Sequence, residues 1–404
     1  MKQVSKNSAL LQCIACFVLL PAIAHPAYAS DKADPLALNF HLMHPGGDSA
    51  PGDPNPAFYL DGAYHLHYIL RHDWKGKKSF SFVHVTSQDM LHWTWLSTKL
   101  QPSFTGHGMF SGTGFLTKEG KPAVIYHGAG SGRNQIAIAK DRKLSAWEKP
   151  FPVEPKTADG GEVEMKHWDP DCFLIGDTYY AFSGGRNPPL LKSKDLKNWT
   201  HVGDFLSHEP DDVVIGEDVS CGNFFPIGNK WMLLCISHPF GCRYYLGDWD
   251  AESEQFVPAT HGRMNWRSDD QNSDSPEEYR DFFAPESVLT ADGRRVMWAW
   301  LTTLHDNALR SESVLSLPRE LSLGEDGGLR IKPLCELELL RHDLVTHENI
   351  EVVPKPRTAG GEATTRIAEL DGDAFEILIT IDREQAKRKR FGFRFFADEN
   401  RIGV

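Results

Sequence analysis

The fold of this chain is decided by residues 52–68, GDPNPAFYLDGAYHLHY, and by the repetition of their pattern. An acidic or polar cluster leads into an apolar strand, a turn that contains glycine, and a second strand. The same order recurs in FSGTGFLTKEGKPAVIY (110–126), HWDPDCFLIGDTYYAF (167–182), SCGNFFPIGNKWMLLC (220–235) and APESVLTADGRRVMWAW (284–300). The central apolar residues, which are 52 to 63 residues apart, are Phe58, Phe115, Phe173, Phe225 and Val288. This period is typical of four-stranded propeller blades and is too long for helical repeats.

A second repeat supports the same architecture. SQDMLHWT (87–94) returns as AKDRKLSAW (139–147) and SKDLKNWT (193–200), with aspartates 52 and 54 residues apart. The sequence therefore predicts an all-β protein with a five-bladed propeller. The first strand of each blade lines the central channel of a propeller, so we expect Asp53, Asp169 and the acids near Cys221 to meet at one funnel.

The two ends of the chain differ from the repeats. Lys2 and Lys6 precede an apolar stretch (9–24), and a small-x-small site ends at Ala29, which together predict a signal peptide over residues 1–29 and export to the periplasm or outside the cell. The propeller is predicted over residues 30–341. After it, FEILITID and FGFRFFAD alternate as strands do, so residues 342–404 are interpreted as the start of a truncated β-sandwich.

Composition excludes several functions. The net charge is -12, so nucleic acid is a poor partner, and the short basic run KRKR (387–390) is interpreted as a solvated turn. No segment after the leader approaches the ~20 apolar residues of a spanning helix. Five cysteines follow the leader, too few for a disulfide framework in a chain of this length. Buried free thiols are the prediction, and a bridge between Cys235 and Cys242 is the alternative.

The chemistry indicated by the channel is that of carboxylates. Retaining cleavage of a glycosidic bond needs a nucleophilic carboxylate and an acid/base group, and a further carboxylate can stabilise the oxocarbenium-like transition state. Asp53 and Asp169 each precede proline and an apolar strand, at matching places two blades apart. Asn55 and Ser111 can hydrogen-bond sugar hydroxyls, and Phe110 and Trp168 offer flat faces on which a sugar ring can lie.

These motifs, taken in order, resemble glycoside hydrolase family 32, the β-fructosidases. The resemblance rests on DPN (53–55), FSG (110–112), DP (169–170) and C-x-x-F-F (221–225). It is supported by VTSQDMLHW (85–93), VMWAWL (296–301), LPRELSL (317–323) and LRIKPLCELELLR (329–341). The resemblance implies hydrolysis of terminal β-fructofuranosyl bonds in sucrose, levan, inulin or short fructo-oligosaccharides, with retention and without a metal or organic cofactor. It also implies that Asp53 is the nucleophile and Asp169 the transition-state stabiliser.

Three departures from the family limit this transfer. Ala50, Pro51 and Gly52 replace the Trp-Met-Asn that usually precedes the nucleophile motif, and Trp168 replaces the usual arginine. Most seriously, Ser220 stands where the family has its acid/base glutamate. A bulge could bring a nearby carboxyl into the funnel, so Glu217 is the predicted acid/base. Asp218 and, more distantly, Glu286 are the alternatives.

Other functions stay open at this point. A sugar-binding propeller without hydrolysis would keep the pocket and lack an acid, and related propellers act on arabinofuranosides and xylosides. Transfer of fructose to another sugar shares the same covalent intermediate. His65 and His67, two residues apart on one strand, could imitate a metal pair, but they are interpreted as strand packing because no third ligand stands at a recognisable spacing.

Overall fold

The structure is a computed structural model that describes residues 41–45, 51–264, 282–301, 313–351, 365–369, 375–382, 384 and 392–393. By compactness the chain divides into two units, and every described residue except Phe375 belongs to the larger one. The predicted signal peptide (1–29) and the KRKR run lie outside the described residues.

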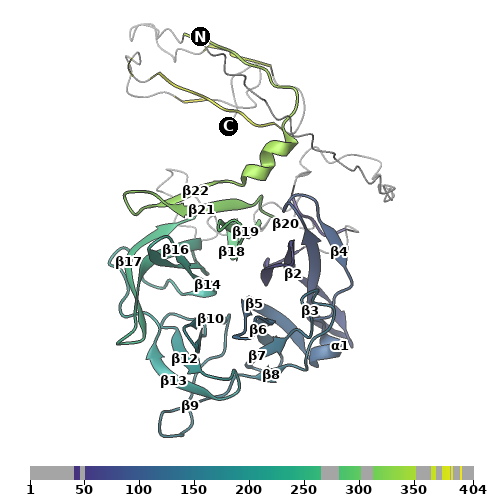
Figure 1. Ribbon diagram of the computed structural model, residues 1–404, viewed down its shortest axis with the longest axis vertical. Helices are drawn as coiled ribbons and strands as arrows, with labels where there is room; N and C mark the ends of the chain where they lie inside the picture. Colours follow the sequence, from purple (N-terminus) through teal and green to yellow (C-terminus); the bar gives the residue numbers. More distant parts are fainter. Residues whose placement is uncertain are drawn as a thin grey trace, which may run out of the picture. The chain divides into compact units, whose positions relative to one another are not determined.

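The described chain folds into five antiparallel sheets that follow one another along the sequence and are arranged around a centre (Figure 1). The first contains β1 (Ala57–Leu60), β2 (Ala63–Trp74), β3 (Lys77–Ser87) and β4 (Thr94–Leu96). The second contains β5 (Gly108–Leu116), β6 (Pro122–Ala129), β7 (Arg133–Ile138) and β8 (Phe151–Pro152). The third contains β10 (Asp171–Ile175), β11 (Thr178–Phe182), β12 (Pro189–Ser193) and β13 (Trp199–Asp204), with β9 (Pro155–Lys156) parallel to β13.

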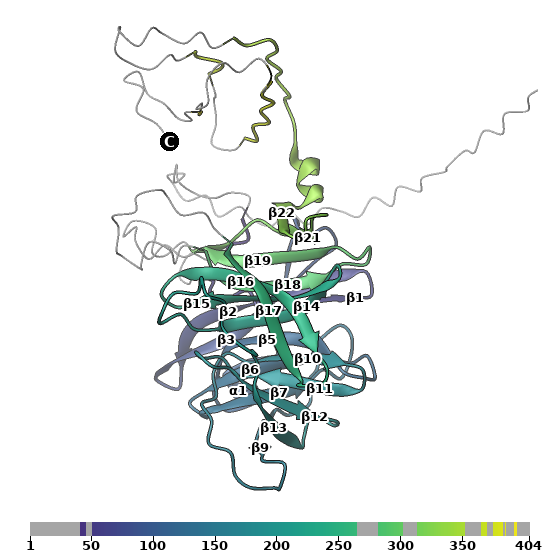
Figure 2. The same ribbon diagram turned by 90° about the vertical axis from the view of Figure 1, so that its left-hand side faces the viewer.

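The last two sheets complete the ring. The fourth contains β14 (Ser220–Ile227), β15 (Lys230–Ser237), β16 (Gly241–Asp250) and β17 (Gln255–Arg263). The fifth contains β18 (Phe282–Leu289), β19 (Arg295–Leu301), β21 (Arg319–Leu323) and β22 (Leu329–Pro333), with β20 (Val314–Leu315) beside β19. The described residues also include two short helices, α1 (Pro102–Thr105) and the 3-10 helix η2 (Cys335–Leu340). Figure 2 shows the same sheets from the side.

The first strands of the sheets form a closed inner ring. β1, β5, β10, β14 and β18 contact one another in that order, and β18 contacts β1. The five repeated sequence stretches are the first two strands of the five sheets. The prediction of an all-β, five-bladed propeller is therefore confirmed, and the heads of the inner strands lie close together although they are far apart in sequence.

Apolar side chains hold each blade to the next. Five separate buried clusters lie between blades 1 and 2, 2 and 3, 3 and 4, 4 and 5, and 5 and 1. The cluster that closes the ring joins Leu66 and Tyr68 of β2 to Val296 and Trp298 of β19. Burying one such side chain stabilises the fold by roughly 1.5–3 kcal/mol. Because these clusters fix the spacing of the blades, they also fix the residues that project into the channel.

Short turns set the strand registers. Asp61 and Gly62 form a two-residue turn between β1 and β2, with φ of 51° and 86°, as a type I′ hairpin requires. The aspartates of the second repeat also have a local structural function. Asp89 accepts the backbone N–H groups of Leu91 and His92 at 2.9 and 2.8 Å, and Asp141 and Asp195 accept equivalent bonds in their own blades.

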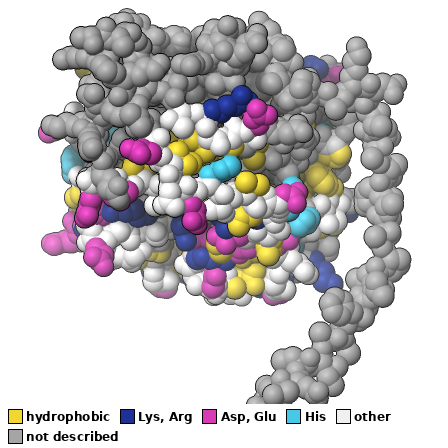
Figure 3. All heavy atoms as spheres, turned by 90° about the horizontal axis from the view of Figure 1, so that it is seen from above, with side chains coloured by type: hydrophobic (Ala, Val, Ile, Leu, Met, Phe, Trp, Pro, Cys, Tyr) yellow, Lys and Arg dark blue, Asp and Glu magenta, His cyan; other side chains and the backbone are white. Residues whose placement is uncertain are grey.

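The structure also bears on the predictions about the cysteines and the C-terminal region. All five cysteines after the leader are free thiols, four of them buried. Among the residues described after Arg341 there is no strand, so the β-sandwich stays a prediction. In the described part of the chain, no helix is both long and apolar enough to cross a membrane. Among the coloured side chains of Figure 3, acidic and basic groups are interspersed.

Candidate active site

Asp53 lies at the head of the innermost strand of blade 1. The segment before β1 runs beside β2, because Gly52 donates its N–H to the carbonyl of Ile69 at 2.7 Å and Ile69 donates to the carbonyl of Asp53 at 3.0 Å. The carboxylate of Asp53 is half-buried and accepts a hydrogen bond from the hydroxyl of Ser111, at the head of blade 2. Burial raises the pKa of Asp53, and the bond from Ser111 partly offsets this effect.

Asp169 reaches the same place from blade 3. It is 4% exposed and has a positive φ of 26°, a strained backbone angle for a residue other than glycine. Its Oδ2 accepts the N–H of Cys221 at 3.3 Å. Burial raises the pKa of Asp169 to about 6, with a further contribution from the charge of Asp53. The two carboxylates therefore interact electrostatically, as expected for groups that meet at the heads of inner strands.

Cys221 joins the three blades at the centre of this site. Its sulfur lies 3.7 Å from Asp53 Oδ2, 3.6 Å from Ser111 Oγ and 3.5 Å from Asp169 Oδ2. A single S–H can donate to only one of these oxygens at a time. Burial and the two neighbouring carboxylates raise the pKa of the thiol well above its usual value, so it stays neutral. In the sequence Cys221 is only a landmark of a motif, and no local pattern predicts its place between the two carboxylates.

A bulge in β14 produces this position. The pairing of β14 with β15 shifts between Ser220 and Asn223, and Cys221 has a φ of 46°. Comparable shifts occur near the heads of β5, between Met109 and Gly112, and of β18, between Phe283 and Glu286. Bulges re-aim side chains at the rims of sheets. Here they bend the inner strands where the candidate site begins.

Aromatic side chains from blades 2 and 3 form one wall beside the carboxylates. Phe110 and Trp168, both predicted to bind sugar, lie with ring centroids 6.5 Å apart, and His127 lies 5.3 Å from Trp168. Phe110 and Trp168 are half-buried, so part of each residue is accessible. Asn55 is 1% exposed, and its Oδ1 has no hydrogen-bond partner within the described residues. An unpartnered buried acceptor next to Asp53 can receive a hydroxyl from a ligand or water.

A second polar layer lies two residues further along the inner strands. Thr113 donates to Asp171, whose other oxygen accepts the N–H of Phe224 at 2.7 Å, and Asn223 lies 3.5 Å from Glu286. Burial raises the pKa of Asp171 to about 6 and that of Glu286 well above its usual value. These contacts link the inner strands of blades 2, 3, 4 and 5. The partners recorded for Glu286 belong to this layer and not to the first.

The predicted acid/base Glu217 is held between two arginines. Its carboxylate lies 3.0 Å from Arg243 Nη1, and it accepts bonds from Arg263 Nη1 at 3.0 Å and Nη2 at 2.6 Å. Its side chain is 0% exposed. Burial raises its pKa, but the arginines outweigh burial and hold that pKa below its usual value. A general acid needs a raised pKa, so these contacts do not favour the predicted role.

Asp218, the alternative, has a different set of partners. Its Oδ2 accepts bonds from His238 Nδ1 at 2.7 Å and from Ser220 Oγ at 2.9 Å, and its Oδ1 accepts the N–H of His238 at 2.8 Å. The side chains of Asp218 and His238 are 22% and 39% exposed. His238 was missed in the sequence because it lies outside every motif, and its link to Asp218 depends on strand pairing.

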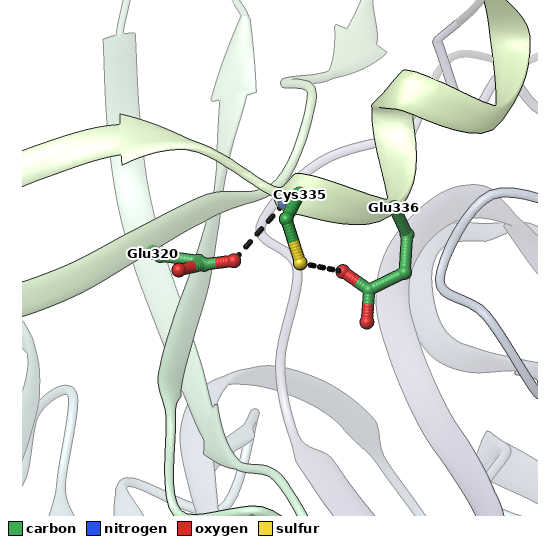
Figure 4. Close-up of side chains that lie close together, drawn as sticks. All are labelled: Glu320, Cys335 and Glu336. Carbon is green, nitrogen blue, oxygen red and sulfur yellow. Dashed lines mark hydrogen bonds between the residues drawn. The ribbon is translucent and has the colours of Figure 1, made fainter.

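Possible metal ligands also lie outside the candidate site. His65, His67 and His84 stack in blade 1, and burial lowers the pKa of His84 to about 3, so they pack as neutral rings. Within the described residues, one group has ligand atoms close enough to hold an ion: Glu320, Cys335 and Glu336 (Figure 4). Arg294 already pairs with both glutamates there, at 2.8 and 2.6 Å, which makes this a salt-bridge cluster.

The five blades match a known protein family. Residues 49–333, which include all five blades, match the sequence profile described as the glycosyl hydrolases family 32 N-terminal domain. The chain belongs to glycosyl hydrolase family 32. The resemblance given by the motifs is thereby confirmed, and the family 32 chain is a glycoside hydrolase.

Individual relatives are similar at low identity. The family 32 chain is 26% identical to the sucrose-6-phosphate hydrolase of Vibrio alginolyticus, over 86% of its own length and 72% of that protein. It is 25% identical to the raffinose invertase of Escherichia coli, over 88% and 74% of the two lengths. The crystal structure of fructan 1-exohydrolase IIa from Cichorium intybus matches with a TM-score of 0.62 and 20% identity, over 79% of this chain and 65% of that one. This structural likeness supports the propeller fold alone.

Proposed function

We propose that this chain is a retaining β-fructosidase that releases fructose from β-fructofuranosides such as sucrose, levan, inulin or fructo-oligosaccharides. One observation carries the proposal: the Oδ2 atoms of Asp53 and Asp169 both lie within 3.7 Å of the sulfur of Cys221. Relatives whose names refer to sucrose-6-phosphate, raffinose and fructan support a fructosyl substrate. We assign Asp53 as the nucleophile and Asp169 as the group that binds fructose hydroxyls and stabilises positive charge.

The proposed chemistry gives Asp53 and Asp169 separate roles. One oxygen of Asp53 attacks the anomeric carbon while the bond from that carbon to the leaving oxygen breaks, which gives a fructosyl ester on Asp53. Ser111 donates to Asp53 and keeps it oriented. Water then attacks the same carbon, the ester bond breaks, and Asp53 returns as a carboxylate. Two displacements at one carbon give retention of configuration.

The residues of the site also suit a furanose ring. Phe110 and Trp168 can supply apolar ring faces, and the carboxylates of Asp53 and Asp169 can supply acceptors. Asn55 adds an unpartnered amide oxygen. This division of apolar and polar surface is typical of sugar sites, where one face of the ring stacks and the hydroxyls are hydrogen-bonded.

The test is fructose release by the purified chain from sucrose, levan and inulin, with Asp53→Asn as the blank because Asn keeps the shape and removes the charge. We expect release that the substitution abolishes. Methanol added as an acceptor should yield methyl β-fructofuranoside, whose retained configuration reports the double displacement. A folded chain that releases no fructose but binds sucrose would make it a sugar-binding propeller. Release of arabinose or xylose from aryl pentosides would instead make it a pentosidase.

Export is proposed separately, from the leader sequence alone. Residues 1–29 carry the basic start, apolar centre and small-residue end of a signal peptide. Expression of the full chain in a bacterium, followed by sequencing of the mature N-terminus, should find Ser30 as the first residue in the periplasm or medium. An intact Met1 in the cytoplasm would contradict this.

A further inference from the structure

We propose that His238, oriented by Asp218, is the proton donor and acceptor of this site. The inference rests on the proposed function, because it supplies the group that the Asp53 and Asp169 pair needs for a double displacement. The first displacement needs a proton on the leaving oxygen, and the second needs a base for water. Ser220 cannot serve, since a serine hydroxyl is far too weak an acid.

The pair is built by strand pairing between β14 and β15. In their antiparallel register Ser220 lies opposite Ile236. Asp218 is two residues before Ser220, and His238 is two residues after Ile236, so the two side chains stand opposite each other at one end of the blade. Three hydrogen bonds fix Asp218, at 2.7 and 2.8 Å from His238 and 2.9 Å from Ser220. Arg243 also donates to the carbonyl of Asp218, at 2.6 Å.

This end of the blade is the end that carries the candidate site. Cys221, the next residue after Ser220, contacts both Asp53 and Asp169 through its sulfur. His238 interacts electrostatically with both of these carboxylates and lowers the pKa of each. A ring contact of 6.1 Å with Phe283, at the head of β18, fixes the imidazole from the neighbouring blade. The imidazole thus approaches the site from blade 4, and the nucleophile approaches from blade 1.

An imidazole suits the task better than the carboxyls near it. Burial raises the pKa of Asp218, but the bonds from His238 outweigh it and keep Asp218 ionised. Glu217 is ionised between its arginines. Histidine exchanges protons near neutral pH, and a carboxylate that accepts from Nδ1 fixes the tautomer in which Nε2 exchanges the proton. Asp218 is therefore a positioning residue in this arrangement, and His238 is the catalytic residue.

The steps balance without a further reactant. Nε2 of the imidazolium gives its proton to the leaving oxygen as Asp53 forms its bond to the anomeric carbon. The neutral imidazole then takes a proton from water as the water oxygen attacks that carbon and the bond to Asp53 breaks. One water molecule is consumed, and Asp53 and His238 return to their starting states.

The experiment compares His238→Gln on two substrates, sucrose and 4-nitrophenyl β-fructofuranoside, whose leaving group needs little protonation. We expect kcat/KM on sucrose to fall by about 10²–10⁴, and the fall on the aryl substrate to be far smaller. Azide should restore turnover and yield a fructosyl azide of retained configuration. Exposed His342, replaced by Gln, is the matched control and should change neither substrate. Thermal unfolding checks that both variants fold.

Each other outcome has a definite reading. Equal losses on both substrates, or no loss, would overturn the role of His238 and leave the proposed function standing. If Asp218→Asn alone shows the substrate difference and the azide rescue, the carboxyl is the donor and the inference is wrong. Under the inference, Asp218→Asn instead shifts the alkaline limb of the pH profile to lower pH, because the imidazolium loses its partner. No release by the unaltered chain overturns the proposed function itself.

Discussion

Replacing Glu217 with Gln should destabilise the propeller and leave the chemical step intact. The side chain of Glu217 is 0% exposed, and that of its partner Arg243 is 1% exposed. Removing one member of a buried ion pair typically costs about 3–5 kcal/mol, because the other charge stays buried without compensation. Arg263 is 28% exposed and can turn toward water. We therefore expect the low end of that range, about 3 kcal/mol.

The assay is equilibrium urea unfolding at pH 7, followed by tryptophan fluorescence. Glu254→Gln is the matched control, since Glu254 pairs with Lys192 at 2.5 Å but is 25% exposed, and its loss should cost less than about 1 kcal/mol. The pH dependence has a definite sign. The pKa of Glu217 is lower in the folded chain, so its stabilisation is complete above the unfolded value of 4.5 and is lost as the pH falls through the folded value. The difference between wild type and variant should shrink at acid pH.

Activity completes this test. If Glu217 is a structural ion, its variant should show the same ratio of rates on sucrose and on the aryl substrate as the unaltered chain. A variant that unfolds like the wild type, yet loses sucrose turnover and keeps aryl turnover, would refute the reasoning and establish Glu217 as the acid/base.

Three more predictions follow from single positions. Asp169→Asn should stabilise the chain above pH 6 and not near pH 4. The pKa of Asp169 is about 6 when folded and 3.8 when unfolded, so the stability of the unaltered chain falls as the pH rises between these values. A difference in stability between variant and unaltered chain that is the same at pH 4 and pH 8 would contradict this. Trp168→Ala should raise KM for sucrose about 3- to 10-fold, the effect of one lost ring contact, and a lower kcat at unchanged KM would argue against stacking. Gly112→Ala should prevent stable folding, because its Cβ would lie 2.0 Å from the carbonyl oxygen of Ile125, whereas Gly52→Ala, with 3.4 Å to its nearest atom, should fold as a soluble control.

The propeller and the carboxylate pair were predictable because both depend on repetition along the chain. Each repeated stretch encodes its own hairpin, through alternating apolar residues and a glycine turn, and five hairpins of one period can bury their faces only against one another. The aspartates of the second repeat also act on their own neighbours in the sequence. Asp89, for example, accepts the backbone N–H groups of the turn that follows it. Asp53 and Asp169 were placed correctly together because each opens an inner strand.

The choice among nearby acids was not predictable in this way. Sequence distance suggested Glu217, since its longer side chain could reach past Ser220. In the structure Arg243 and Arg263, from β16 and β17, hold that carboxylate, and His238, from the end of β15, takes Asp218. These partners lie 20 or more residues away, and no repeat links them to the acids.

The sequence by itself determined the all-β architecture, the five-fold ring and the two aspartates at its centre, because strand periodicity and turns act between neighbouring residues. Only the tertiary structure decided that Cys221 lies between those aspartates. It also decided that Glu217 pairs with arginines and that Asp218 pairs with a histidine. The physical reason is that a bulge at Cys221, with its φ of 46°, re-aims β14 by one residue. The charged partner that each acid then meets comes from β16, from β17 or from the residue that follows β15, and not from β14 itself.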